Sequence, residues 1–98
     1  MAFLNSKTNG VTTEATVYTP SAGTVGTVIG LSICPTSGNE TTASLKLEGS
    51  YIVKDISITN GSTLVPIGGE QKMVVLDGES LKVQADNNVD VIVSVLEQ

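Results

Sequence analysis

Ten carboxylates and one thiol are the side chains best suited to acid–base or nucleophilic chemistry, because the sequence contains no histidine. Histidine is the commonest general base, the usual partner of a serine or cysteine nucleophile, and the commonest transition-metal ligand. Triad chemistry is therefore excluded, and we expect no enzymatic activity. The single Cys34 precedes Pro35 and has no cation beside it in sequence that would activate a thiolate. We expect Cys34 to be a small, buried apolar residue.

Paired carboxylates can hydrolyse a glycosidic bond without histidine. Eight acids are available for such a pair: Glu40, Glu48, Asp55, Glu70, Asp77, Glu79, Asp86 and Asp90. Most of them fall in expected turns or at outward strand positions. The chain also has two Tyr and no Trp, which leaves little surface on which a sugar ring could stack. We therefore expect these acids to be solvated side chains that keep the protein soluble.

Calcium binding is the better non-catalytic role for the acids. Asp77 and Glu79 flank a glycine, and Asp86 and Asp90 enclose another polar turn, so oxygen ligands gather in two turns. These turns lack the ligand spacing of an EF-hand, and Asx-turns explain their composition without a metal. We expect no metal or other cofactor, and calcium at these four acids stays an open alternative.

The elements that carry these side chains are expected to be strands. Val, Ile and Thr make up 32 of the 98 residues, and β-branched side chains suit a pleated sheet. Period-two alternation and short apolar runs between Gly, Pro, Asn and Asp turns predict a series of strands. The segments are residues 12–19, 24–34, 43–48, 51–59, 63–67, 73–76, 81–85 and 89–95. They predict an all-β fold, a single β-sandwich or jelly-roll-like domain of short antiparallel strands, with a small up-and-down barrel as the alternative.

Two of these segments predict which side chains face the core. In residues 24–34 the odd positions, such as Val25, Ile29 and Leu31, form the apolar face. Gly26 and Gly30 then lie on the other face, where a bulge or bend explains them better than a ligand seat does. In the last strand, Val89, Val91, Val93 and Val95 share one face.

The domain organisation is expected to be one β-sandwich over residues 11–98, preceded by an arm over residues 1–10. The arm is polar after Phe3 and Leu4, has no clear period and ends in the turn pair Asn9–Gly10. A domain of this size buries only about two-thirds of its unfolded surface, so oligomerisation is a natural source of further stability.

Charge and hydropathy exclude several partners. Five Lys, no Arg and ten acids give a net charge of −5, which disfavours nucleic-acid binding. No apolar stretch approaches the roughly 18 residues of a membrane-spanning helix. There is also no charged segment followed by an apolar run, as in a secretory signal. We expect a protein that has no membrane partner and is assembled in a cytoplasm.

Turn and strand residues along most of the chain carry a resemblance. Residues 18–25 (YTPSAGTV) lead into a strand, and residues 29–38 (IGLSICPTSG) finish it in a Thr-Ser-Gly turn. Three later segments fit the same pattern, namely residues 60–64, 76–83 and 89–95. In this order the segments resemble a loose group of small virion structural proteins encoded by tailed phages.

The resemblance covers residues 15–96, and in one place the chain departs from the group. Cys34 and Pro35 stand where Asn-like residues usually precede the Thr-Ser-Gly turn. The resemblance implies a particle component, namely a capsid decoration (cement) protein, a neck or tail accessory, or part of a receptor-binding fibre. It transfers no individual functional residue, because the group has no catalytic motif.

The function that we expect from this resemblance is capsid decoration on the surface of the virion. Such a protein forms a homotrimer and stabilises the phage head by binding between subunits of the major capsid protein. The arm of residues 1–10 would add to a neighbour's sheet edge or groove, with Phe3, Leu4 and Asn5 as partner-binding residues. A frayed terminus is the other interpretation of this segment. The alternative function is a tail, neck or fibre accessory module that binds a host surface receptor.

Overall fold

The computed structural model describes residues 2–67 and 72–98. Gly68–Gly69, where a turn is expected, and Glu70 lie outside these residues. The strands are β1 (Ala2–Val11), β2 (Ala15–Tyr18), β3 (Gly26–Pro35), β4 (Thr41–Leu47), β5 (Ser50–Ile58), β6 (Leu64–Ile67), β7 (Met73–Val75), β8 (Leu81–Ala85) and β9 (Val89–Glu97). Strands β2 to β9 correspond to the eight segments expected from the sequence. The ninth strand, β1, is formed by the segment expected to be an arm.

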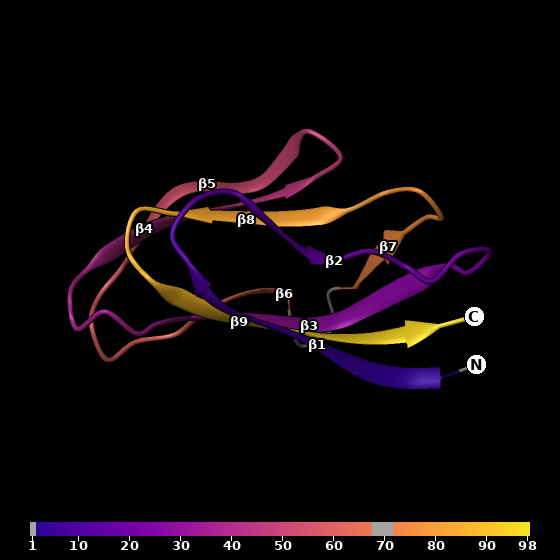
Figure 1. Cartoon of the computed structure of the whole chain (residues 1–98), viewed down its shortest axis with the longest axis horizontal. Helices are drawn as coiled ribbons and strands as arrows, with labels where there is room; N and C mark the ends of the chain where they lie inside the picture. Colours follow the sequence, from indigo (N-terminus) through magenta and orange to yellow (C-terminus); the bar gives the residue numbers. More distant parts are fainter. Residues whose placement is uncertain (1, 68–71) are drawn as a thin grey trace.

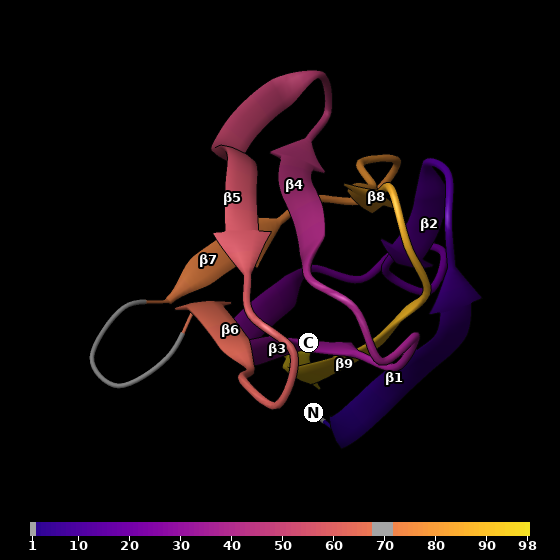
Figure 2. The ribbon, with the colours of Figure 1, turned by 90° about the vertical axis from the view of Figure 1, so that its left-hand side faces the viewer.

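The strands form two antiparallel sheets that lie against each other (Figures 1 and 2). The five-stranded sheet has the order β1-β9-β3-β6, and β7 also pairs with β3. The four-stranded sheet has the order β2-β8-β4-β5. The first half of the chain thus pairs strand by strand with the second half, which is the jelly-roll arrangement. The prediction of an all-β sandwich is confirmed, and the separate sheets exclude the up-and-down barrel.

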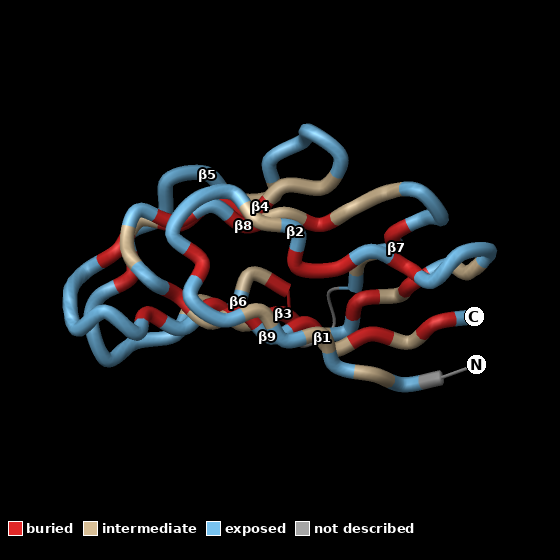
Figure 3. Tube along the Cα trace, viewed as in Figure 1, coloured by how far each residue is buried: buried red, intermediate tan, exposed pale blue. Residues whose placement is uncertain are grey.

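The core lies between the two sheets, where buried residues from both inner faces meet (Figure 3). Val89, Val91, Val93 and Val95 are fully buried, as the alternation in the last strand predicts. Aliphatic residues of the four-stranded sheet, among them Leu45, complete the core. Because the sequence has no Trp, branched aliphatic side chains fill most of this core, and Tyr18 adds an aromatic ring.

Strand β3 changes face in its middle, where the expected pattern is wrong in part. Leu31 and Ile33 are buried as expected, but Val28 is also fully buried and Ile29 is 37% exposed. The pairing of β3 with β9 shifts between Val28 and Gly30, so Ile29 is the extra residue of a β-bulge. Because a bulge adds one residue to one strand, it moves the following side chains to the opposite face. The bend interpretation of Gly30 is confirmed.

Strand β1 occupies an edge of the five-stranded sheet and pairs with β9 of its own chain. The pairing extends from Ala2 opposite Glu97 to Thr8 opposite Val91. Leu4 packs against the core, while Ser6 donates a 2.8 Å hydrogen bond from Oγ to the carbonyl oxygen of Val17 in the other sheet. The segment therefore belongs to the sandwich itself, and only one edge of it is left for a neighbour.

Candidate binding surfaces

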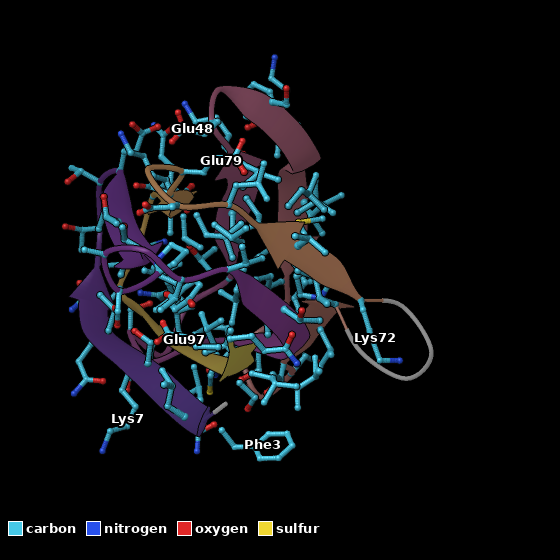
Figure 4. All side chains as sticks on the ribbon, turned by 90° about the vertical axis from the view of Figure 1, so that its right-hand side faces the viewer. Phe3, Lys7, Glu48, Lys72, Glu79 and Glu97 are labelled. Atoms are coloured by element: carbon cyan, nitrogen blue, oxygen red, sulfur yellow. The ribbon has the colours of Figure 1, made fainter. Side chains whose placement is uncertain are left out.

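The three residues predicted to bind a partner lie together on β1, with different exposures. Phe3 is 73% exposed and points away from the sandwich on the outer side of the five-stranded sheet (Figure 4). Asn5 is exposed on the same side and accepts a 2.7 Å hydrogen bond at Oδ1 from the hydroxyl of Ser94. Leu4 alternates to the inner side and packs against the core. Phe3 and Asn5 are therefore the two of the three that face outward.

Strand register extends the surface of Phe3 across the whole sheet. Phe3 lies opposite Leu96 of β9, Leu96 opposite Thr27 of β3, and Thr27 opposite Val74 of β7. Val74 is 51% exposed, so both ends of this row are open to solvent. Apolar side chains thus run from edge to edge of the outer face, interrupted only by a threonine.

Two isoleucines widen this row into a patch. The bulge residue Ile29 and Ile92 of β9 are both exposed. Ile29 borders a hollow of about 230 Å³ together with Phe3, Asn5 and Ser94. We call the following residues the outer apolar patch: Phe3, Ile29, Val74, Ile92 and Leu96.

Charge is sparse around the outer apolar patch. Lys7 lies opposite Ile92 on the outer side of β1 (Figure 4). Asp90 of β9 accepts a 3.1 Å hydrogen bond at Oδ1 from the backbone N–H of Gly10. Both charges lie toward the same end of the sheet, while the exposed Lys72 lies directly before β7, two positions before Val74. The charges therefore border the patch and its centre carries none. An apolar sheet face of this kind is suited to protein contact.

Cys34 is exposed, so the prediction of a buried cysteine is wrong. Leu31 and Ile33 direct their side chains into the core, and strand alternation then turns Cys34 to the outer face. It lies opposite Asp90. The apolar character of cysteine favoured burial, and the strand register decides against it.

The outer face of the four-stranded sheet has a different chemistry, because a polar cleft of about 420 Å³ opens there. Its floor is formed by Ser44 of β4, Gln84 of β8 and their strand neighbours, and Thr12 from the β1–β2 connection stands beside them. Tyr51 and Asp55 of β5 also line it. Hydroxyl, amide and carboxylate groups therefore converge on one hollow, from segments far apart in sequence.

A tight turn and a bulge position the β5 residues of this cleft. Glu48 and Gly49 join β4 to β5 with φ values of 46° and 83°, and two consecutive positive φ values are those of a type I′ hairpin turn. Asp55 has a φ of 52° at a point where the β4–β5 pairing shifts register. Its N–H donates a 2.9 Å hydrogen bond to Ser44 Oγ, which ties the bulge to β4.

Asp86 is held as an anion at the rim of the cleft. Its Oδ1 accepts hydrogen bonds of 2.7 Å from the N–H of Thr42 and from the hydroxyl of Thr41. These bonds lower the pKa of Asp86 below its usual value, and the bond from the Thr42 backbone has the largest effect. Asp86 therefore contributes a negative charge to the cleft at neutral pH.

Lysines surround the Tyr51 ring at one side of the cleft. The Nζ atoms of Lys46 and Lys54 lie 5.4 and 5.1 Å from the ring centroid, within range of a cation–π interaction. Lys46 also forms an ion pair with Glu14, and Lys82 approaches the same carboxylate. The hydrogen bond with Lys46 is the largest cause that lowers the pKa of Glu14, and the charges of Lys46 and Lys82 lower it further.

Each of the four acids considered as calcium ligands accepts a hydrogen bond from a different part of the backbone. Asp77 accepts a hydrogen bond from the N–H of Gly23, and Glu79 accepts one from the N–H of Leu76. Within residues 2–67 and 72–98, no three His, Cys, Asp or Glu side chains are grouped as metal ligands would be. Backbone N–H groups thus account for the position of each carboxylate.

Sequence reasoning missed Glu97, which among the acids of residues 2–67 and 72–98 is the buried one. Only 8% of Glu97 is exposed, and it accepts hydrogen bonds from the hydroxyls of Tyr18 and Ser21 at 2.7 and 3.0 Å. Its place in the apolar-alternating last strand, at an inward position, was the available signal.

Comparison of the chain with protein-family models, with curated proteins and with solved structures finds no match. In the described part of the chain, no helix has the length and apolar character needed to cross a membrane. The likeness to phage virion proteins therefore rests on the turn and strand residues of the sequence alone.

Proposed function

We propose that this chain is a virion structural protein, a capsid decoration protein that binds between major capsid subunits of a tailed phage. In this proposal it works as a homotrimer on the capsid surface. The observation that carries the proposal is the outer apolar patch, which crosses the full width of a sheet without a charge in its centre.

The exposure of the patch residues argues for a partner. Phe3, Val74 and Ile92 are 73%, 51% and 45% exposed on one face of a protein that carries 15% charged residues. Isolated exposed apolar residues are ordinary, but a contiguous group of them marks a surface that another protein covers. A capsid subunit is the partner that the sequence resemblance suggests.

The jelly roll is compatible with this role, since viral coat proteins commonly use it. A shared fold does not determine function, so this support is by analogy. The edge of β1 adds a second means of contact, because an unpaired strand edge can take up a strand from a neighbour.

Copy number in particles of the phage that encodes this chain tests the proposal. Decoration requires a copy number comparable to that of the major capsid protein, measured by quantitative mass spectrometry of purified particles. A few copies per particle would contradict decoration and favour the tail, neck or fibre alternative. Absence of the chain from the particles would contradict both. Sedimentation of the isolated protein at the mass of one chain would contradict the homotrimer.

Substitution in the patch tests the surface itself. Phe3→Ser should lower occupancy on particles because it removes the most exposed apolar side chain of the patch. Tyr51→Ser is the matched control, since Tyr51 is also an exposed aromatic residue, at 48%, but stands on β5 of the other sheet. Equal occupancy of the two variants would show that the patch does not dock the protein.

The alternative role has one observation in its favour, the polar cleft on the four-stranded sheet. A decoration protein needs a docking face and no cleft on its other side. A tail or fibre module could bind a host receptor in such a cleft.

A further inference from the structure

We propose that the polar cleft on the four-stranded sheet binds a neutral carbohydrate. The inference concerns the sheet opposite the outer apolar patch, and so it does not depend on how the chain docks in a particle. Its volume of about 420 Å³ falls within the range of roughly 300–1,000 Å³ typical of small-ligand sites.

The first argument is the hydrogen-bonding capacity of the lining. Thr42 and Gln84 stand on the adjacent strands β4 and β8. Their sequence neighbours Ala43 and Ala85 are buried, so Thr42 and Gln84 point outward. None of the side-chain hydrogen bonds within the described residues uses the side chain of Thr42 or Gln84, or the hydroxyl of Tyr51. A hydroxyl donates and accepts, and an amide does both at separate atoms. Such groups match the many hydroxyls of a sugar.

The second argument is charge. Two carboxylates, Asp55 and Asp86, line the cleft, and no lysine does. Asp86 is held ionised by the N–H of Thr42, so an anionic group beside Asp86 would be repelled. The ammonium groups of Lys46 and Lys54 lie at the Tyr51 side of the cleft but do not line it. Carboxylates accept hydrogen bonds from hydroxyl groups. A neutral polyol therefore fits the lining better than an anion does.

The third argument is the fixed wall that Tyr51 provides. Its ring is 48% exposed and is positioned by the ammonium groups of Lys46 and Lys54. Aromatic rings offer a flat apolar surface beside a polar handle. Because two lysines lie over the ring, a sugar would meet the ring edge and the Tyr51 hydroxyl rather than stack on a ring face.

The strained backbone of Asp55 is a further argument that the cleft is a functional site. A non-glycine residue with φ of 52° is uncommon, although aspartate tolerates it better than most residues. Such conformations are concentrated at functional sites. Here the bulge brings the Asp55 side chain to the cleft, where Ser44 Oγ lies 3.4 Å from its Oδ1.

The test is an NMR titration of the uniformly ¹⁵N-labelled full chain. The probes are glucose, galactose, mannose and N-acetylglucosamine, with N-acetylneuraminic acid and calcium chloride as separate arms. At least one neutral sugar should shift the amide signals of the cleft residues in a saturable way at millimolar concentration. No shift with any neutral sugar would overturn the proposal, and so would cleft shifts caused only by the anionic sugar or by calcium.

Variants show whether the cleft side chains carry the binding. Gln84→Ala and Thr42→Val should each weaken the affinity about tenfold, the effect of losing one good hydrogen bond. Thr16→Val is the matched control, because Thr16 is an exposed threonine of the same sheet outside the cleft. An equal loss in Thr16→Val would overturn the assignment. If Thr42→Val does not fold, the exposed Gln84 provides the test alone.

Discussion

The hydroxyl of Tyr18 donates a 2.7 Å hydrogen bond to Oε2 of Glu97, and both residues are buried where β9 ends beside the β2–β3 connection. Residues 79 positions apart are thus joined in a place where neither meets much water. Ser21 adds hydrogen bonds from its hydroxyl and its N–H to the same carboxylate. A buried carboxylate is stable only when such donors surround it. The contact therefore joins the end of β9 to β2 and the β2–β3 connection.

Stability should fall as the pH is lowered through the carboxylate range. The hydrogen bond from Tyr18 is the largest cause that lowers the pKa of Glu97, against the opposing effect of burial. A pKa lowered in the folded state means that the unfolded chain binds the proton more readily. The contribution is therefore complete above the ordinary value of 4.5 and is lost as the pH falls below it. Urea unfolding as a function of pH measures this loss.

Tyr18→Phe should flatten this acid dependence, because it removes the main donor to Glu97. Some dependence should remain, since the pKa values of Asp86 and Glu14 are also lowered in the folded state. An acid limb as steep as that of the unmodified protein would show that Tyr18 does not hold the carboxylate ionised.

A second loss of stability is expected at alkaline pH. Burial first, and then the neighbouring Glu97, raise the pKa of Tyr18 above its ordinary value of 10.0. The unfolded chain therefore loses the phenolic proton first, and stability declines as the pH rises above that value. Tyr18→Phe lacks this proton. Its unfolding temperature should therefore fall less than that of the unmodified protein as the pH is raised from neutral to strongly alkaline. An unchanged alkaline limb would contradict this assignment.

Gly26→Ala should destabilise the protein by about 1–3 kcal/mol, the usual effect of overpacking. A Cβ at Gly26 would overlap the Tyr18 hydroxyl and would lie 2.8 Å from ring atoms Cε2 and Cζ. Combining it with Tyr18→Phe should recover part of the loss, because the closest clashing atom is then gone. Strictly additive effects in equilibrium unfolding would contradict the close packing of these two residues.

Local rules predicted most of the fold, and they failed where strands are irregular or paired at long range. Eight strands follow from period-two patterns and turn residues. Strand β1 was not predicted, because its inward positions include the polar residues Ser6 and Thr8 and it therefore shows no apolar alternation. Gly30 marked a possible bulge or bend in β3, but the simple alternation still placed Ile29 on the core face.

The candidate sites were predictable to different degrees. Phe3, Leu4 and Asn5 were predicted to bind a partner as residues of the arm. The structure sets Phe3 and Asn5 on an exposed face, whereas Leu4 packs against the core. The polar cleft had no sequence signal, because Thr12 and Asp86 come together only through the jelly-roll pairing. The two tyrosines likewise separate only in three dimensions, as Tyr18 is buried and Tyr51 is exposed.

Cys34 should react with a thiol reagent in the folded protein, because it is exposed on the outer face of β3. Ellman's reagent should modify the native protein about as fast as the chain unfolded in urea. Protection in the isolated protein that disappears on dilution would indicate that a second copy covers this face. Strong protection at all protein concentrations would contradict the exposure of Cys34.

Deletion of residues 2–10 should destabilise the domain, whereas an interchangeable arm could be lost without effect. The deletion exposes the edge of β9 and removes Leu4, which packs against the core. A partly buried leucine and one strand pairing together contribute on the order of 2 kcal/mol. For a domain of this size that corresponds to a fall in the unfolding temperature of about 10 °C.

Phe3→Ser separates this structural role of β1 from the binding role that we propose for it. The Phe3 side chain is 73% exposed and supports little of the core, so calorimetry should give an unfolding temperature within about 2 °C of the unmodified protein. If the deletion leaves the unfolding temperature unchanged, β1 is a detachable arm after all. If Phe3→Ser lowers it as much as the deletion does, Phe3 belongs to the core rather than to a docking surface. Reduced particle occupancy for Phe3→Ser at unchanged stability would place the docking contact on the outward side of β1.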